Sequence, residues 1–142
     1  MNICEADILN AYLQAPSSEK NYIPKCGIEF GLENVGKRAK IVRALYEGKS
    51  SGRDFRNHLR SCMVHLGFDS CKADPDVWIR ELSKADGSKY YEYTQLYVDD
   101  LLVVSERAEH VIRTKIGKYF ELKEASIGLP DIYLGGKFPR SN

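Results

Sequence analysis

Two adjacent aspartates interrupt an apolar part of the chain, because Asp99 and Asp100 stand between the strand-like runs 90–97 and 101–104. Aspartate is depleted in strands, and an unpaired buried carboxylate is costly. The pattern therefore predicts a tight turn between two strands. The two carboxylates are then either solvated, which is usual for turn residues, or compensated by a cation. A magnesium ion that handles phosphates would suit them, since it favours one or two carboxylates plus substrate oxygens.

The bulk composition predicts a single folded domain over residues 1–142. The chain has 142 residues, 43% of them hydrophobic and 29% charged, which is typical of globular proteins. The net charge is only +1, so no global positive field attracts nucleic acid. A polynucleotide partner would need a local patch, another domain or a metal ion.

The cysteines and the apolar runs bear on the cellular compartment. The four cysteines are far apart and form no CxxC pair, so neither a zinc site nor a disulfide framework is indicated. No apolar run reaches the roughly 18 residues of a membrane span, and the first residues do not resemble a signal peptide. We expect an intracellular protein, cytoplasmic or nuclear, with reduced thiols and no membrane partner.

The hydrophobic periodicity predicts an α+β fold, with an antiparallel sheet and helices packed on one of its faces. Apolar residues recur at helical spacing after Ser50 and Ser51, and Gly67 follows the last of them, as expected at a helix end. The expected elements are a strand at 3–8, a helical turn at 9–13, loop over 14–40, a strand or short apolar segment at 40–46, a helix from Ser50 or Ser51 to Gly67, strands at 77–82, 90–97 and 101–104, a helix at 106–120 and a strand within 132–138.

A third carboxylate, Asp7, ends the first expected strand. If that strand pairs beside the hairpin, Asp7 and Asp99 converge at one edge of the sheet. Such carboxylates suit two magnesium ions about 3.5–4 Å apart, one activating an attacking hydroxyl and the other holding phosphate oxygens. A helix N-cap is the alternative role of Asp7.

Six blocks follow one another along nearly the whole chain. Together they resemble the reverse transcriptase of copia-type LTR retrotransposons. The resemblance implies the palm of a polymerase and RNA-directed DNA synthesis from deoxynucleoside triphosphates on a primed RNA or DNA template, within a larger polyprotein. The blocks are DILNAYL at 7–13, ALYEGK at 44–49, LGF at 66–68 followed by Asp74, YVDD at 97–100, FELK at 120–123 and YLGG at 133–136.

The resemblance also assigns roles to single residues. Asp7, Asp99 and Asp100 match the aspartates that bind two Mg²⁺ ions, for which Mn²⁺ could substitute. Tyr12 matches the aromatic residue that rejects a ribose 2′-hydroxyl, although a core tyrosine is the alternative. Lys123 matches a lysine that could protonate the pyrophosphate leaving group; otherwise it is a surface lysine.

Two more residues match the block that packs near nucleotide and template. They are Tyr46 and Lys49, the latter being either a phosphate contact or a solvated loop lysine. Three arginines on the helix that follows form either a solvated face or, less favoured, a contact with template phosphates. These arginines are Arg53, Arg56 and Arg60.

Some residues depart from the family pattern. Glu47 stands where the family has glycine, which adds bulk and negative charge where nucleotide or template should pass. Gly136 replaces a larger apolar residue. The family's fingers segment has no room before Asp7, and thumb, RNase H, integrase and protease regions are not expected in the chain.

A degenerate, non-catalytic remnant of a retroelement is therefore the alternative to a polymerase domain. An unrelated two-carboxylate metal hydrolase is disfavoured, because no histidine accompanies the aspartates. The three histidines, His58, His65 and His110, lie on expected amphipathic helices.

Overall fold

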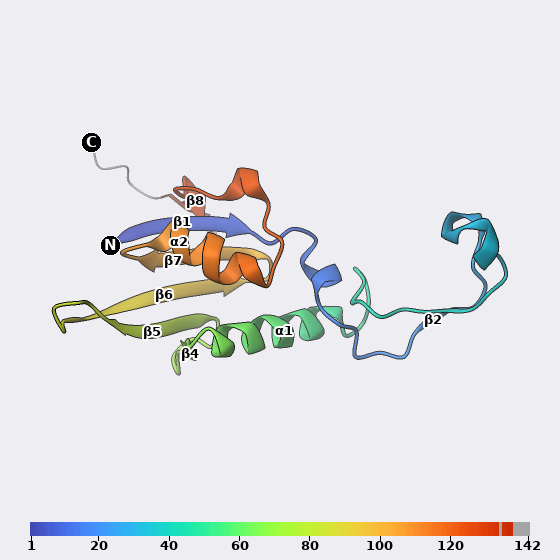
Figure 1. Ribbon diagram of the computed structural model, residues 1–142, viewed down its shortest axis with the longest axis horizontal. Coiled ribbons are helices and arrows are strands. Elements are labelled where there is room, and N and C mark those ends of the chain that lie inside the picture. The colour runs from blue at the N-terminus through green and yellow to red at the C-terminus, as the bar shows by residue number, and fades with distance from the viewer. Residues whose placement is uncertain (134, 138–142) are drawn as a thin grey trace. The chain divides into compact units, whose positions relative to one another are not determined.

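The chain forms two compact units, shown as a computed structural model in Figure 1. The structure describes residues 1–133 and 135–137. Unit 1 comprises Met1–Leu9 and Arg60–Asn142, and unit 2 comprises Asn10–Leu59. The division falls inside helix α1 (Ser51–His65).

Unit 1 is built on a five-stranded antiparallel sheet (Figure 1). This confirms the prediction of an α+β fold with an antiparallel sheet. The expected first strand and the two strands around the aspartates all belong to it. In spatial order the strands are β1 (Asn2–Asp7), β7 (Asp100–Ser105), β6 (Lys89–Tyr97), β5 (Val77–Ser83) and β4 (Asp69–Ser70).

One face of this sheet forms the core of unit 1. Side chains alternate across a strand, and the buried ones share a face through the register, as in the row Cys4–Val103–Thr94–Trp78. The helical segment 108–118 contacts β1 and β7. On the opposite face the residues of β1 and β7 are only partly buried, and Asp7 and Asp100 are among them.

The helix expected at 106–120 is irregular. It consists of α2 (Ala108–His110), a π-helical turn (Val111–Lys115) and a 3₁₀ turn (Ile116–Lys118). Val111, Ile112 and Ile116 are buried, and β-branched residues crowd a regular helix. The hydroxyl of Thr114 also donates to the carbonyl of His110 at 2.7 Å, a contact that bends helices.

A buried ion pair ties the strands of unit 1 together. Glu92 on β6 is 3% exposed and accepts from Arg80 Nε at 3.1 Å and from Ser105 Oγ at 2.7 Å. Arg80 Nη1 also donates to the carbonyl of Leu66 at 2.7 Å, and its guanidinium lies 4.4 Å from the centre of the Phe68 ring. This pair thus joins three strands to the turn after α1.

Helix α1 confirms the sequence prediction. Its apolar residues at three- and four-residue spacing, such as Phe55, Leu59 and Met63, are buried. Gly67 has φ +81°, the left-handed conformation that closes a helix. At the other end, the hydroxyl of Ser50 donates to Asp54 Oδ2 at 3.0 Å.

Unit 2 is mostly loop, as predicted for 14–40. The expected strand over 40–46 is wrong, because only Lys40 belongs to a strand. Val42, Leu45 and Tyr46 are exposed and form no continuous buried face. The short elements are η1 (Ala11–Gln14), β2 (Tyr22–Ile23), η2 (Ile28–Phe30), η3 (Leu32–Asn34) and β3 (Ala39–Lys40).

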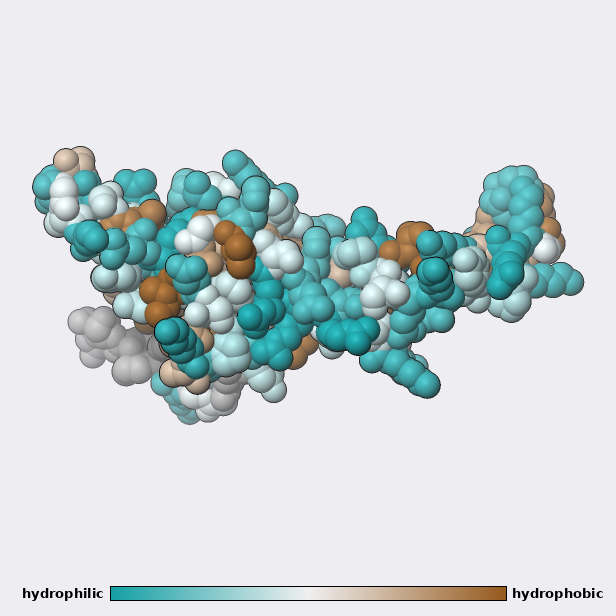
Figure 2. All heavy atoms as spheres, turned by 90° about the horizontal axis from the view of Figure 1, so that it is seen from below, coloured by the Kyte–Doolittle hydropathy of each residue, from teal (hydrophilic) through white to brown (hydrophobic). Residues whose placement is uncertain are grey.

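Figure 2 shows one face, on which hydrophilic residues predominate and hydrophobic residues form small, separate spots. The strand expected within 132–138 is a short hairpin of β8 (Ile132–Tyr133) and β9 (Gly136–Lys137); Leu134 and Phe138 lie outside the described residues. Across the described part of the chain, the helices are too short or too polar to cross a membrane.

Replacing Glu92 should destabilise unit 1 strongly. We expect Glu92→Ala to lower the free energy of unfolding by about 3–5 kcal/mol, because it leaves the partly buried guanidinium of Arg80 without its carboxylate and removes the partner of the buried Ser105 hydroxyl. Glu81→Ala is the matched control, since Glu81 pairs with Lys89 at the surface and should lose at most about 1 kcal/mol. Urea denaturation followed by circular dichroism measures both, and equal losses would contradict the expectation.

Candidate functional site

The sheet brings two of the three predicted aspartates side by side. Asp7, the last residue of β1, is the register partner of Asp100, the first residue of β7. Opposite residues of an antiparallel pair present their side chains on the same face, with Cβ atoms about 4.5–5.5 Å apart. The Ile8 N–H also donates to the carbonyl of Asp99 at 2.8 Å, which fixes the hairpin beside the end of β1.

The hairpin turn holds a strained backbone. Tyr97 and Asp100 pair across a two-residue turn in which Val98 has φ +53°. This position normally requires glycine, and a β-branched residue there is a genuine outlier. Strain of this kind costs about 1–3 kcal/mol and is concentrated at functional sites. The turn presents Asp99 at the exposed end of the hairpin.

A short segment after the irregular helix holds Asp7 in place. The N–H of Asp7 donates to Ser126 Oγ at 2.8 Å, and its carbonyl accepts from the Lys123 N–H at 2.9 Å. The hydroxyl of Ser126 in turn donates to the carbonyl of Lys123 at 2.7 Å. Lys123 Nζ lies 3.7 Å from Asp7 Oδ2, and the Lys123 side chain is 60% exposed. The predicted lysine is therefore adjacent to the predicted carboxylate.

Burial and neighbouring negative charges raise the pKa values of two carboxyl groups at this edge of the sheet. Burial raises the pKa of Asp100, and the charges of Asp99 and Asp7 and a hydrogen bond with Asp7 raise it further. Burial likewise raises the pKa of Glu5, with contributions from Asp7, Asp100 and Asp131. We call Glu5, Asp7, Asp99 and Asp100 the carboxylate cluster.

Tyr133 is a further neighbour of the carboxylate cluster. Its pKa is raised by burial and then by the charges of Asp100 and Glu5. Its hydroxyl oxygen is buried and has no hydrogen-bond partner within the described residues. The phenol therefore stays neutral beside the carboxylates and adds no further negative charge.

The donor chemistry of the carboxylate cluster fits magnesium that is shared with a phosphate substrate. In the ranges 1–133 and 135–137, no three acidic, histidine or cysteine side chains are grouped to hold a metal by themselves. Magnesium does not need such a cage, because it binds through one or two carboxylates plus substrate oxygens and water. Asp7 and Asp100 supply a carboxylate pair of that kind, and a cation would relieve their mutual repulsion.

The predicted nucleotide-binding residues lie in unit 2. The rings of Tyr12 and Tyr46 are 4.9 Å apart between centroids, and Tyr12 also contacts the buried ring of Phe55 at 5.9 Å. Tyr12 is half-buried, so it is neither a full core residue nor a free surface residue. Lys49 is exposed. The structure thus brings the two predicted tyrosines together and leaves Lys49 on a solvated turn.

The departure at Glu47 from the pattern that the sequence resembles coincides with an unusual backbone. Glu47 has φ +68°, in the left-handed region that favours glycine. The position that carries glycine in the family pattern thus keeps a glycine-like conformation in this chain.

Several neighbours of the aspartates were not predicted from the sequence. The strand period of two could have indicated Glu5, since it lies two residues before Asp7 on the same face. No local pattern points to Asp131, Ser126 or Tyr133, because they reach this edge only through the fold.

Comparison of the sequence with the models of known protein families finds no match, and comparison with curated proteins finds none either.

Neutralising Asp100 should stabilise the protein at neutral pH. A carboxyl with a raised pKa binds more protons in the folded state than in the unfolded state at pH values between its two pKa values. Its contribution to stability therefore falls as the pH rises through the folded-state pKa. A cross-strand like-charge pair costs roughly 0.2–1 kcal/mol, so we expect Asp100→Asn to raise the Tm by about 1–4 °C at pH 7.

The stabilisation by Asp100→Asn should shrink toward pH 4, because a carboxyl with a raised pKa takes up its proton earlier as the pH falls. Asp86→Asn provides the contrast, because hydrogen bonds from the side chain and backbone of Ser88 lower the pKa of Asp86. That variant should lose stability at pH 7. Thermal denaturation at both pH values measures the effect, and a Tm gain that is independent of pH would refute the assignment.

Proposed function

We propose that this chain is the palm of a copia-type reverse transcriptase, an RNA-directed DNA polymerase that extends a primer by two-metal nucleotidyl transfer. The observation that carries the proposal is the pairing of Asp7 with Asp100 beside the strained hairpin turn. Two carboxylates separated by more than ninety residues meet there at one edge of an antiparallel sheet. The ordered sequence blocks give the pair its interpretation as a polymerase site.

The carboxylates would act by holding metal ions. Asp7, Asp99 and Asp100 would bind two Mg²⁺ ions, or Mn²⁺, at the exposed end of the hairpin. Magnesium bound there would supply positive charge that makes the primer 3′-hydroxyl easier to deprotonate and offsets the negative charge of the phosphate groups during transfer. The strained turn fixes where Asp99 stands before any substrate arrives, which reduces the reorganisation that binding would require.

Lys123 would assist departure of the leaving group. Its ammonium lies 3.7 Å from Asp7 Oδ2 and is largely exposed, so it can turn toward a phosphate without losing a buried contact. A proton donated from Nζ to the pyrophosphate would lower the charge that develops on it.

The tyrosines of unit 2 would select the sugar. A planar ring that rests on Phe55 and Tyr46 is restricted in its movement, so Tyr12 could exclude a 2′-hydroxyl by its bulk. Lys49, which is exposed, would contact a phosphate of template or nucleotide.

Removal of one hairpin carboxylate should abolish both metal binding and synthesis. We expect Asp99→Asn to weaken Mn²⁺ binding, measured by calorimetry with a deoxynucleoside triphosphate present, and to reduce primer extension at least about 100-fold. Even groups that only orient metal ligands contribute 10–100-fold. Extension is measured on a primed polyribonucleotide, with the chain joined to the fingers and thumb of a copia-type enzyme.

Asp86→Asn is the matched control for this prediction, because it removes an equal charge from the turn between β5 and β6. It should leave both measurements unchanged. Primer extension that persists in Asp99→Asn would refute the assignment.

A non-catalytic remnant of a retroelement is the second candidate, and the backbone of Glu47 favours it. A glutamate with φ +68° carries strain where the family has glycine. Such strain is the trace expected when a glycine has been replaced after selection for activity ended.

Glu47→Gly should stabilise unit 2 by about 1 kcal/mol, since a side chain in the left-handed region costs 1–2 kcal/mol and glycine loses part of this gain through its backbone entropy. Asn10→Gly is the control, because Asn10 has φ +47° but asparagine tolerates that region. Thermal unfolding measures both. If the same substitution leaves nucleotide affinity unchanged in the joined polymerase, Glu47 is not what impairs binding, and the remnant hypothesis loses its main support.

A further inference from the structure

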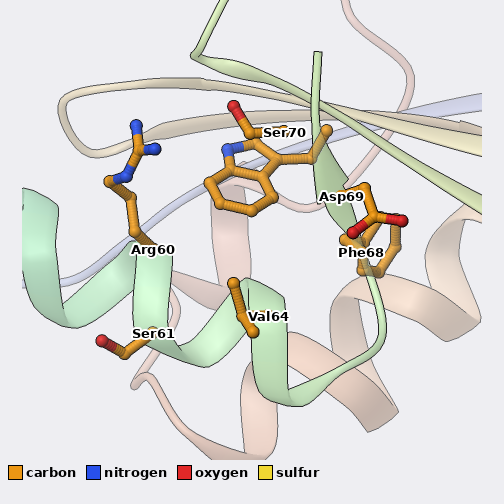
Figure 3. Close-up of a pocket in the computed structure, with 7 residues that line it drawn as sticks. Arg60, Ser61, Val64, Phe68, Asp69 and Ser70 are labelled. Carbon is orange, nitrogen blue, oxygen red and sulfur yellow. The ribbon is translucent and has the colours of Figure 1, made fainter. Parts of the chain in front are cut away.

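A second surface feature of unit 1 lies away from the carboxylate cluster. A hollow of about 410 Å³ opens between the last turns of α1 and the edge strand β4. Figure 3 shows Arg60 and Asp69 at opposite ends of this hollow, with Val64 between them on the helix. Among the residues that the structure describes, β4 is the last strand on this side of the sheet. We call the surface formed by Arg60, Val64, Asp69 and Ser70 the β4 edge patch.

The charges of the β4 edge patch form no ion pairs inside the described part of the chain. The guanidinium of Arg60 lies over the Trp78 ring, 5.4 Å from its centre, and makes no ion pair among the described residues. The carboxylate of Asp69 is likewise without an ion pair or hydrogen bond there. Val64 is 63% exposed. The patch therefore presents a positive end, an apolar centre and a negative end.

The backbone of β4 adds an open edge to this pattern. The Cys71 N–H donates to the carbonyl of Val77 at 2.7 Å, and hydrogen-bonded positions alternate along an antiparallel pair. Ser70, opposite Trp78, is therefore a position whose N–H and C=O point away from β5. An unpaired edge of this kind is a template for another strand.

We infer that the β4 edge patch is a self-association surface on which a second copy of this chain docks about a two-fold axis near Val64. Such an axis brings Arg60 of one copy opposite Asp69 of the other, and does so twice. It also sets Val64 against Val64 and Ser70 against Ser70. A surface that is positive at one end, apolar at its centre and negative at the other end is complementary to itself under this rotation, as an isologous interface requires.

The fluorescence of Trp78 can report on this contact. Its side chain is 2% exposed, and its indole N–H has no hydrogen-bond partner within the described residues. A carboxylate that pairs with Arg60 from the second copy changes the charge close to this ring, because the Arg60 guanidinium lies over it. Trp78 is the single tryptophan of the sequence, so its emission reports on this surface alone.

The test is sedimentation velocity of the full chain from about 10 µM to 1 mM, together with tryptophan emission over the same range. The patch is small, so we expect a weak dimer with a Kd of roughly 10–1,000 µM. Arg60→Glu and Asp69→Arg should each weaken association at least about tenfold, because each places like charges opposite one another twice. The double variant should restore it, since the pairs are re-formed with the signs exchanged.

Two further variants complete the test. Val64→Glu sets two carboxylates against each other at the axis and should abolish the dimer and the concentration-dependent emission change, while its exposed position leaves folding intact. Arg107→Glu makes the same charge change as Arg60→Glu at an exposed residue beyond β7 and should leave association unchanged. A chain that stays monomeric to 1 mM, a dimer insensitive to the single variants, or a double variant that fails to restore association would each overturn the inference.

Discussion

The pairing of β1 with β7 is the constraint on which the rest of unit 1 depends. It joins the first residues of the chain to residues about a hundred positions later, and its register places Asp7 opposite Asp100. A slip of one residue would send every buried side chain of β1 to the other face. The same register that buries Cys4 and Ala6 thus leaves Asp7 at the open face.

The core and the carboxylate cluster occupy opposite faces of one sheet, and this arrangement separates the core contacts from the proposed metal site. Glu92, buried with Arg80 and Ser105 on the core face, is fully compensated. Asp100 is only partly compensated, and its pKa is raised by burial and by neighbouring charges. Glu92 therefore holds the strands together, whereas Asp100 lies among negative charges and forms no ion pair of its own within the described residues. At the proposed magnesium site, a bound cation would offset this negative charge.

Much of this organisation follows from local sequence. The alternation in β1, β6 and β7, the helix that ends at Gly67, and the turn around Asp99 could all be predicted from hydrophobic period and turn chemistry. The hydrophobic period did not predict that the helix over 106–120 is irregular, or that the segment 40–46 is not a strand. Buried β-branched residues and the back-bonding hydroxyl of Thr114 distort the former. The latter lacks a buried face, since Val42, Leu45 and Tyr46 are exposed.

The sequence by itself determined the α+β class, the hairpin and which carboxylates were candidates, because period, turn residues and motif order are local properties. Only the tertiary structure decided that Asp7 faces Asp100, that Lys123 and Ser126 hold the end of β1, and that Glu5 and Tyr133 are neighbours. It also decided that β4 is an open edge beside Arg60 and Val64. These relations join residues far apart in the chain, so they depend on strand order and register, which no local pattern encodes.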